Sequence, residues 1–171
     1  MNVIIHDLEK EKFQALFYNI NSDICIISNN GKIKNCIGCF GCWVKSPGSC
    51  VIKDGYDNMG EILSKANKLI IISQCCFGGY SPFVKNILDR SISYLLPFFK
   101  IIDNETHHRQ RYKKDLSLSV YFYGEHISQQ EIVTAKKLVE ANSKNFYVSD
   151  YKIAFYNSPN DFCNEGEIQW K

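Results

Sequence analysis

Short apolar runs alternate with amphipathic stretches along this chain of 171 residues. Each run has the length of a strand, and the run at 69–72 is apolar without alternation, which is typical of a strand covered on both faces of a parallel sheet. The pattern therefore predicts five strands, at residues 1–7, 24–27, 69–72, 116–123 and 151–156.

Apolar residues at helical spacing predict four helices between these strands. The first has its apolar face between residues 13 and 20, and the last runs to about residue 143. Start signals are expected at a capping box of Asn58 and Glu61, at Ser81 followed by Pro82, and at a capping box of Ser128 and Glu131. Residues 97–115 are predicted to be a long connection, and residues 157–171 an irregular tail.

Strands that alternate with helices predict an α/β fold, here a single domain over residues 1–171. Right-handed crossovers then give a doubly wound, five-stranded parallel sheet with helices on both faces, and one such solution has the strand order 2-1-3-4-5. Its ligand site lies where the winding reverses, at the carboxyl ends of strands 1 and 3. The loop after strand 2 is expected beside that site.

Four of the eight cysteines lie in that loop, as Cys36-x-x-Cys39-x-x-Cys42-x7-Cys50. Soft thiolates at close spacing suit a [4Fe-4S] cluster, and the intervening glycines allow the loop to curl around it. Zinc is less favoured because a second, separated Cys-x-x-Cys pair is missing. Metal-free thiols that simply pack are the remaining alternative, since free cysteine is among the most buried residue types.

Composition narrows the classes of function. The formal net charge is +2 with mixed signs, so neither a nucleic-acid partner nor a membrane partner is expected. The absence of a secretory signal and of a long apolar run predicts a soluble, cytoplasmic protein, in which disulfides are disfavoured. One strongly basic run stands out at residues 107–114.

Several motifs together resemble the flavodoxin-like NAD(P)H-dependent FMN reductases, and most closely the iron-sulfur flavoproteins. They are the cysteine motif, Gly48-x-Cys50-Val51-Ile52-x-Asp54, the glycine loop before Tyr80, and Lys85-x-x-x-Asp89-Arg90. The resemblance spans about residues 24 to 95. It implies the flavodoxin-like form of the predicted sheet and a homo-oligomer, either a dimer or a tetramer.

The resemblance also implies the chemistry. It suggests an FMN-dependent oxidoreductase that takes electrons from NAD(P)H and passes them to a small-molecule or protein acceptor, with a [4Fe-4S] cluster as an optional second cofactor. The implied metal ligands are Cys36, Cys39, Cys42 and Cys50. The implied flavin-binding residues are Gln74, Cys75, Cys76, Phe77, Gly78, Gly79, Tyr80, Tyr123 and Gly124. No catalytic residue is assigned.

The first loop departs from the family pattern. Relatives present Ser, Thr and Gly to the FMN phosphate at a helix N-terminus, whereas this chain has His6-Asp7-Leu8-Glu9-Lys10-Glu11. This difference favours an alternative function, in which the domain lacks flavin and serves as a binding module or as a thiol- or metal-based redox sensor.

Overall fold

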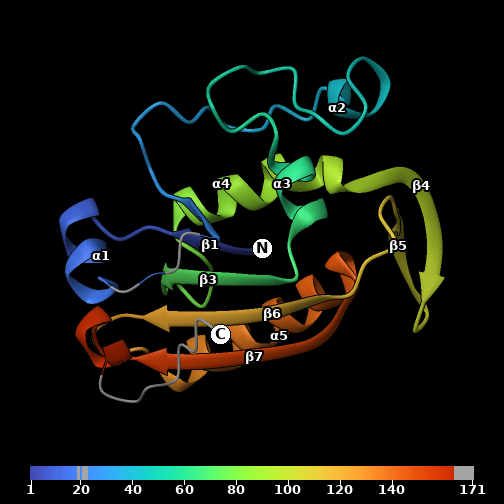
Figure 1. Cartoon of the computed structure of the whole chain (residues 1–171). Helices are drawn as coiled ribbons and strands as arrows, with labels where there is room; N and C mark the ends of the chain where they lie inside the picture. Colours follow the sequence, from blue (N-terminus) through green and yellow to red (C-terminus); the bar gives the residue numbers. More distant parts are fainter. Residues whose placement is uncertain (19, 21–22, 164–171) are drawn as a thin grey trace.

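The computed structural model describes residues 1–18, 20 and 23–163. Five parallel strands form one sheet in the order β2-β1-β3-β6-β7 (Figure 1). They are β1 (Asn2–His6), β2 (Ile24–Ile27), β3 (Lys68–Gln74), β6 (Leu116–Tyr123) and β7 (Val148–Tyr156). In order of these five strands this is 2-1-3-4-5, so the predicted doubly wound, flavodoxin-like sheet is confirmed.

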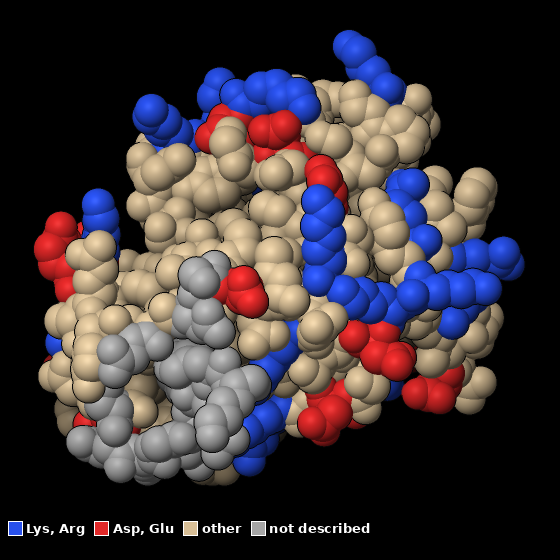
Figure 2. Space-filling view, viewed as in Figure 1, with Lys and Arg blue, Asp and Glu red and all other residues tan. Residues whose placement is uncertain are grey.

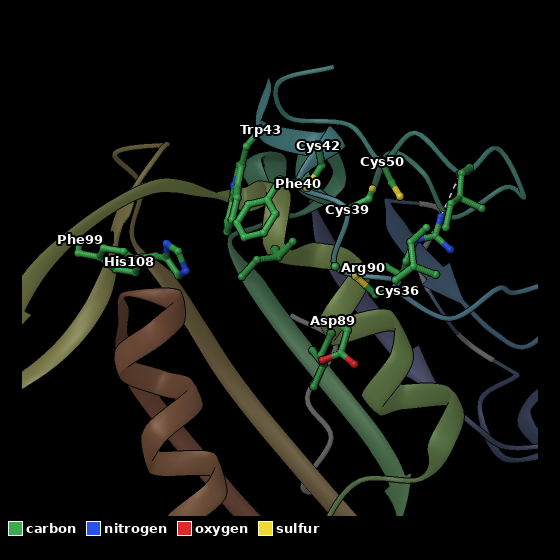
Figure 3. Close-up of a pocket in the computed structure, with 15 residues that line it drawn as sticks. Cys36, Cys39, Phe40, Cys42, Trp43, Cys50, Asp89, Arg90, Phe99 and His108 are labelled. Atoms are coloured by element: carbon green, nitrogen blue, oxygen red, sulfur yellow. Dashed lines mark hydrogen bonds between the residues drawn. The ribbon is translucent and has the colours of Figure 1, made fainter. Parts of the chain in front are cut away.

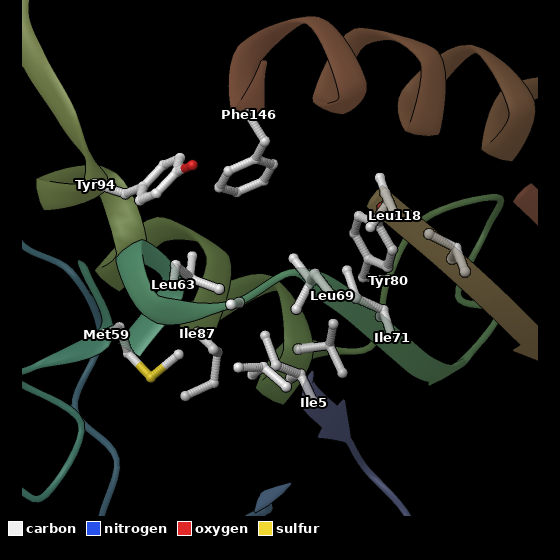
Figure 4. Packing of buried hydrophobic residues seen from close by; sticks show 14 of the residues in the cluster. Ile5, Met59, Leu63, Leu69, Ile71, Tyr80, Ile87, Tyr94, Leu118 and Phe146 are labelled. Atoms are coloured by element: carbon white, nitrogen blue, oxygen red, sulfur yellow. The ribbon is translucent and has the colours of Figure 1, made fainter. Parts of the chain in front are cut away.

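Alternate residues of the central strands enter two separate cores, because successive side chains of a strand point to opposite faces. Helices α3 (Met59–Lys65), α4 (Pro82–Arg90) and α5 (Gln129–Phe146) cover the face that holds Ile5, Leu69 and Leu118 (Figure 4). Helix α1 (Lys10–Leu16) and the short 3-10 helix η2 (Pro159–Cys163) cover the opposite face.

The chain after β7 gives the second core its last large side chain. Residues 157–171 were predicted to be an irregular tail, but Pro159–Cys163 form η2, and Phe162 is buried against Phe17, Tyr121 and Tyr156. Burial of this ring explains why the face is closed by such a short element. The rest of the predicted tail, residues 164–171, lies outside the described part of the chain.

The helix-start signals are confirmed at two of three positions. Ser81 accepts a hydrogen bond from the backbone of Val84 with proline at the first helical position, and Ser128 with Glu131 forms a complete capping box. The capping box predicted at Asn58 is wrong: Asn58 makes no side-chain cap at the start of α3, which has seven residues. Helix α3 is held instead by buried Met59 and Leu63 in the larger core.

The long connection predicted at residues 97–115 is also wrong. The 3-10 helix η1 (Ser91–Tyr94) leads into β4 (Leu95–Ile102) and β5 (Glu105–Gln110), which form a separate antiparallel hairpin. Asp103 and Asn104 make the turn, and both have positive φ, which these residue types tolerate and which two-residue hairpins require. Pro97 within the first strand and the basic residues of the second strand concealed the pairing.

The basic run lies largely on β5 and the turn after it. Arg109 donates to Phe99 O, and Arg111 donates to the carbonyls of Ser93 and Leu95. Figure 2 shows Lys and Arg side chains gathered toward this end of the molecule with Asp and Glu beside them. These bonds of the basic run therefore hold the hairpin against η1. Among the described residues, no helix is long and apolar enough to cross a membrane.

Candidate functional site

The loops after β3 and β6 meet at the C-terminal edge of the sheet, at the end where the arrowheads lie in Figure 1. The backbone N–H of Cys75 donates to Tyr123 O at 2.8 Å, and that of Gly124 donates to Tyr156 O at 3.0 Å. A cavity of about 400 Å³ lies beside these bonds, lined by residues that follow β3, β6 and β7. Among its lining residues are Gln74, Cys75, Tyr123 and Gly124. The structure thus brings together four of the nine implied flavin-binding residues.

The other five implied residues follow β3 in a tight turn. Cys76 and Gly79 exchange two backbone hydrogen bonds, and Phe77 at the tip is 94% exposed. Gly78 has a φ of +79°, and a Cβ there would lie 2.7 Å from Thr134 Cβ on α5. The glycine is therefore required by the turn and by its close approach to helix α5.

Tyr80 packs inward. Its ring is stacked on Phe122 with centroids 5.3 Å apart, and its hydroxyl accepts a hydrogen bond from Asn142 at 3.1 Å. Burial raises the pKa of Tyr80 to about 12. Of the two aromatic residues in this loop, only Phe77 presents its ring to solvent at the edge of the sheet.

The first loop is closed by a carboxylate. Asp7 accepts hydrogen bonds from the backbone N–H of Gln74 at 2.8 Å and from the Tyr123 hydroxyl at 2.9 Å. Burial and then the Asp7 carboxylate raise the pKa of Tyr123 well above its usual range, so the phenol stays protonated. Asp7 thus occupies two hydrogen-bond donors at the ends of β3 and β6, so these donors are not available to a bound anion.

Two groups in or beside this loop that could neutralise a phosphate, His6 and Lys12, make other contacts. His6 is buried and stacked on Phe13 at 3.8 Å between centroids, and burial lowers its pKa to about 4. Lys12 donates to Asn160 at 2.6 Å. Helix α1 has only seven residues and carries Glu11 in its first turn, after Glu9 at the N-cap. The carboxylates of this loop therefore oppose binding of the FMN phosphate.

The four-cysteine segment lies at the other end of the sheet. After β2 the chain runs along α4, where Cys36 N donates to Asn86, and reaches the short helix α2 (Gly41–Val44) near η1 and the hairpin (Figure 1). Trp43 donates to Leu95 O at 2.9 Å. The predicted position beside the C-terminal edge is wrong because the loop length allows the segment to follow α4 back to the end where the strands begin.

The cysteines share one cavity without forming a metal site. Cys36 and Cys39 are exposed, Cys42 is half-buried, and Cys50 is 8% exposed (Figure 3). Burial and then the nearby Cys50 raise the pKa of Cys42, which favours the thiol over the thiolate. Within the described residues no three His, Cys, Asp or Glu side chains are arranged to hold a metal ion. The structure gives no support to the iron-sulfur cluster or to zinc.

Sequence reasoning named Arg90 and Asp54 as parts of two motifs but missed that their contact fixes this segment. Arg90 at the end of α4 binds both carboxylate oxygens of Asp54 and donates to the carbonyls of Lys34 and Ile52. Asp54 in turn accepts from the backbone of Lys34 and Tyr56. The motif Lys85-x-x-x-Asp89-Arg90 therefore combines a surface pair, Lys85 with Asp89, and a buried clamp.

Solved structures of similar fold cover nearly the whole chain. An FMN-dependent NADH-azoreductase from Bacillus anthracis, solved with FMN, has 13% identity and a TM-score of 0.52, over 96% of this chain and 93% of the other. The azoreductase AzrA has 12% identity and a TM-score of 0.56, over 98% and 92%. An NADPH-quinone reductase from P. pentosaceus has 12% identity and a TM-score of 0.53, over 96% and 92%.

At this level of identity the likeness shows a shared fold. Comparison with protein-family models finds no match, and comparison with curated proteins finds none.

Proposed function

We propose that this chain is a flavodoxin-like oxidoreductase that binds a flavin ring at the C-terminal edge of the sheet and takes electrons from NAD(P)H. The observation that carries the proposal is the cavity of about 400 Å³ at the C-terminal edge of the sheet, where residues that follow β3, β6 and β7 line it next to the point between β1 and β3 at which the winding reverses. The names of the similar structures support this choice, because they are an azoreductase and a quinone reductase of the same fold.

The chain's own residues would position the ring. Phe77 offers an exposed aromatic face, and Gly124 leaves space beside Cys75, since a Cβ there would meet only Ile127 and Cys75 at 3.4 Å or more. A bound flavin would supply hydride acceptance from the nicotinamide and electron transfer to an acceptor. The thiols nearby are not redox partners in this proposal, because burial raises the pKa of both Cys75 and Cys76.

Reconstitution tests the proposal. Protein purified without oxygen is incubated with FMN or riboflavin, passed through a desalting column and examined for the flavin absorption bands, for NADH and NADPH oxidation with a quinone or azo acceptor, and for iron. Retained flavin together with nucleotide oxidation supports the proposal, and protein that stays colourless with both flavins contradicts it. The iron content tests the [4Fe-4S] expectation in the same sample.

A cavity-filling variant adds a local test. Gly124→Leu places a side chain where the ring would lie, so we expect flavin retention to be lost while the melting temperature stays close to that of the wild type. Equal retention by the variant would show that flavin lies elsewhere. Light scattering of the same samples tests the homo-oligomer, which stays a prediction.

One observation favours a second candidate function, a flavin-free binding or sensing module. The Asp7 carboxylate already bridges the β3 and β6 loops through Gln74 and Tyr123, which closes the edge without a ligand. This candidate predicts that the protein stays colourless after incubation with FMN and with riboflavin.

A further inference from the structure

A second cavity, of about 510 Å³, lies at the end of the sheet opposite to the proposed flavin position. The cysteine segment, the end of α4 and the β4–β5 hairpin form its walls (Figure 3). Its volume is in the range of pockets that enclose small organic molecules. Neither the flavin proposal nor a metal site accounts for it.

Aromatic rings dominate this cavity. Trp43 is held by its bond to Leu95 O, and its ring lies 4.9 Å from that of His108 and 5.4 Å from that of Phe40. Phe99 lies 4.7 Å from His108 on the hairpin side. Phe40 and Phe99 are 61% and 59% exposed although both line the cavity, so each leaves a ring face free. Such walls favour a flat aromatic molecule.

Arg90 closes one side of the cavity without offering a donor to it. The side chain is 0% exposed, and its Nη atoms are used by Asp54 and by backbone carbonyls. The Nε–H is buried beside the Cys50 thiol, out of reach of a molecule in the cavity. A hydrogen-bonding group for a ligand must therefore come from another wall of the cavity.

His108 supplies this group. Its Nδ1 lies 2.9 Å from Leu96 O, and because a carbonyl oxygen only accepts, the proton of the neutral ring must be on Nδ1. Nε2 is then the ring atom that can accept a hydrogen bond. A ligand that carries one hydrogen-bond donor would satisfy this atom of His108.

We propose that this cavity binds a planar aromatic molecule that carries one hydroxyl donor, such as a phenol with a fused ring system. The aromatic walls stack on the ring system, and the hydroxyl donates to His108 Nε2. The proposal does not depend on flavin binding, since the cavity and the C-terminal edge share no lining residue.

The test uses 7-hydroxycoumarin as a fluorescent probe and measures its polarisation with the full chain, at a pH below the pKa of its phenol. We expect saturable binding that Phe99→Ala weakens about tenfold, because a stacking face is lost. Phe98→Ala is the matched control: Phe98 precedes Phe99 on β4, is 63% exposed and does not line the cavity. Phe77→Ala, at the opposite edge, should also leave binding unchanged.

A second pair of measurements tests the polar contact. Replacing the probe by 7-methoxycoumarin removes the hydroxyl donor, so wild-type protein should bind it at least fivefold more weakly in a competition assay. His108→Asn retains a donor for Leu96 O but lacks Nε2, so this variant should bind the two coumarins equally. The proposal is overturned by absence of saturable binding, by equal effects of the Phe98 and Phe99 variants, by loss of binding in Phe77→Ala, or by an unchanged preference in His108→Asn.

Discussion

Arg90 and Asp54 form a two-point ion pair inside the protein, with Nη1 to Oδ2 at 2.8 Å and Nη2 to Oδ1 at 3.0 Å. The exposed fractions of the two side chains are 0% and 3%. The pair joins the last turn of α4 to the chain that follows the four cysteines. It therefore fixes the chain after the cysteine segment against α4, and Arg90 also lines the second cavity.

Removing one partner of this pair should be strongly destabilising. We expect Asp54→Ala to lower the free energy of unfolding by about 3–5 kcal/mol, because it leaves the guanidinium buried without its counter-ion. Denaturant titration measures this change. Asp57→Ala is the matched control: Asp57 pairs with Lys53 at the surface, where the loss should be at most about 1 kcal/mol. Similar losses in the two variants would contradict the role given to the buried pair.

His6 should make the free energy of unfolding depend on pH. Burial lowers its pKa to about 4 from 6.5, so the unfolded chain binds more protons between these values, and the stability present above pH 6.5 is lost as the pH falls toward 4. We expect wild-type protein to lose about 2 kcal/mol more between pH 7 and pH 5 than His6→Phe does. Unfolding titrations at the two pH values measure the difference.

The control for this measurement is His126→Asn, because His126 is exposed and has a positive φ that asparagine tolerates. Its pH dependence should match that of the wild type. A His6→Phe variant with an unchanged slope would show that His6 is not the source.

The sequence identified the sheet because strand burial leaves a direct signature. Residues 69–72 are apolar without interruption and form the centre of β3, between β1 and β6. Helix-start signals that act within four residues, such as the capping box of Ser128 and Glu131, could also be recognised in the sequence. These features depend on local chemistry and on burial alone.

The path of the long loops could not be predicted from the sequence in the same way. The position of the cysteine segment depends on the contact of Arg90 with Asp54, which are 36 residues apart. The β4–β5 hairpin depends on cross-strand pairing, and its clearest sequence signal was the pair Asp103-Asn104. For the candidate site, the sequence predicted that both loops lie at the same edge of the sheet, but it could not tell that Tyr80 faces the core and Phe77 faces solvent.

That difference between two aromatic residues can be tested directly. Tyr80→Phe removes the hydrogen bond from Asn142 and should cost about 1 kcal/mol of stability without changing flavin retention. Phe77→Ala should reduce flavin retention with little effect on stability, because its ring is exposed. Denaturation and reconstitution of both variants measure the two properties. The reverse pattern would place the flavin against Tyr80.

The acidic first loop should make the chain discriminate against phosphate. Asp7 lies where the loops meet, and Glu9 and Glu11 carry exposed carboxylates at the start of α1. Since FMN and riboflavin share the same ring system, a normal phosphate site would strongly favour FMN. Here we expect riboflavin to bind at least as tightly as FMN, because repulsion from the carboxylates opposes the phosphate.

Removing the two exposed carboxylates should change this preference. The double variant Glu9→Ser/Glu11→Gln should bind FMN about tenfold more tightly while its affinity for riboflavin stays the same, and added salt should reduce the difference because it screens exposed charges. Glu61→Gln on α3 is the matched control, since it removes one exposed carboxylate at a distance from the loop. Flavin fluorescence quenching measures the affinities of both proteins for FMN and riboflavin. A wild-type protein that strongly prefers FMN would show that the phosphate is bound by residues outside this loop.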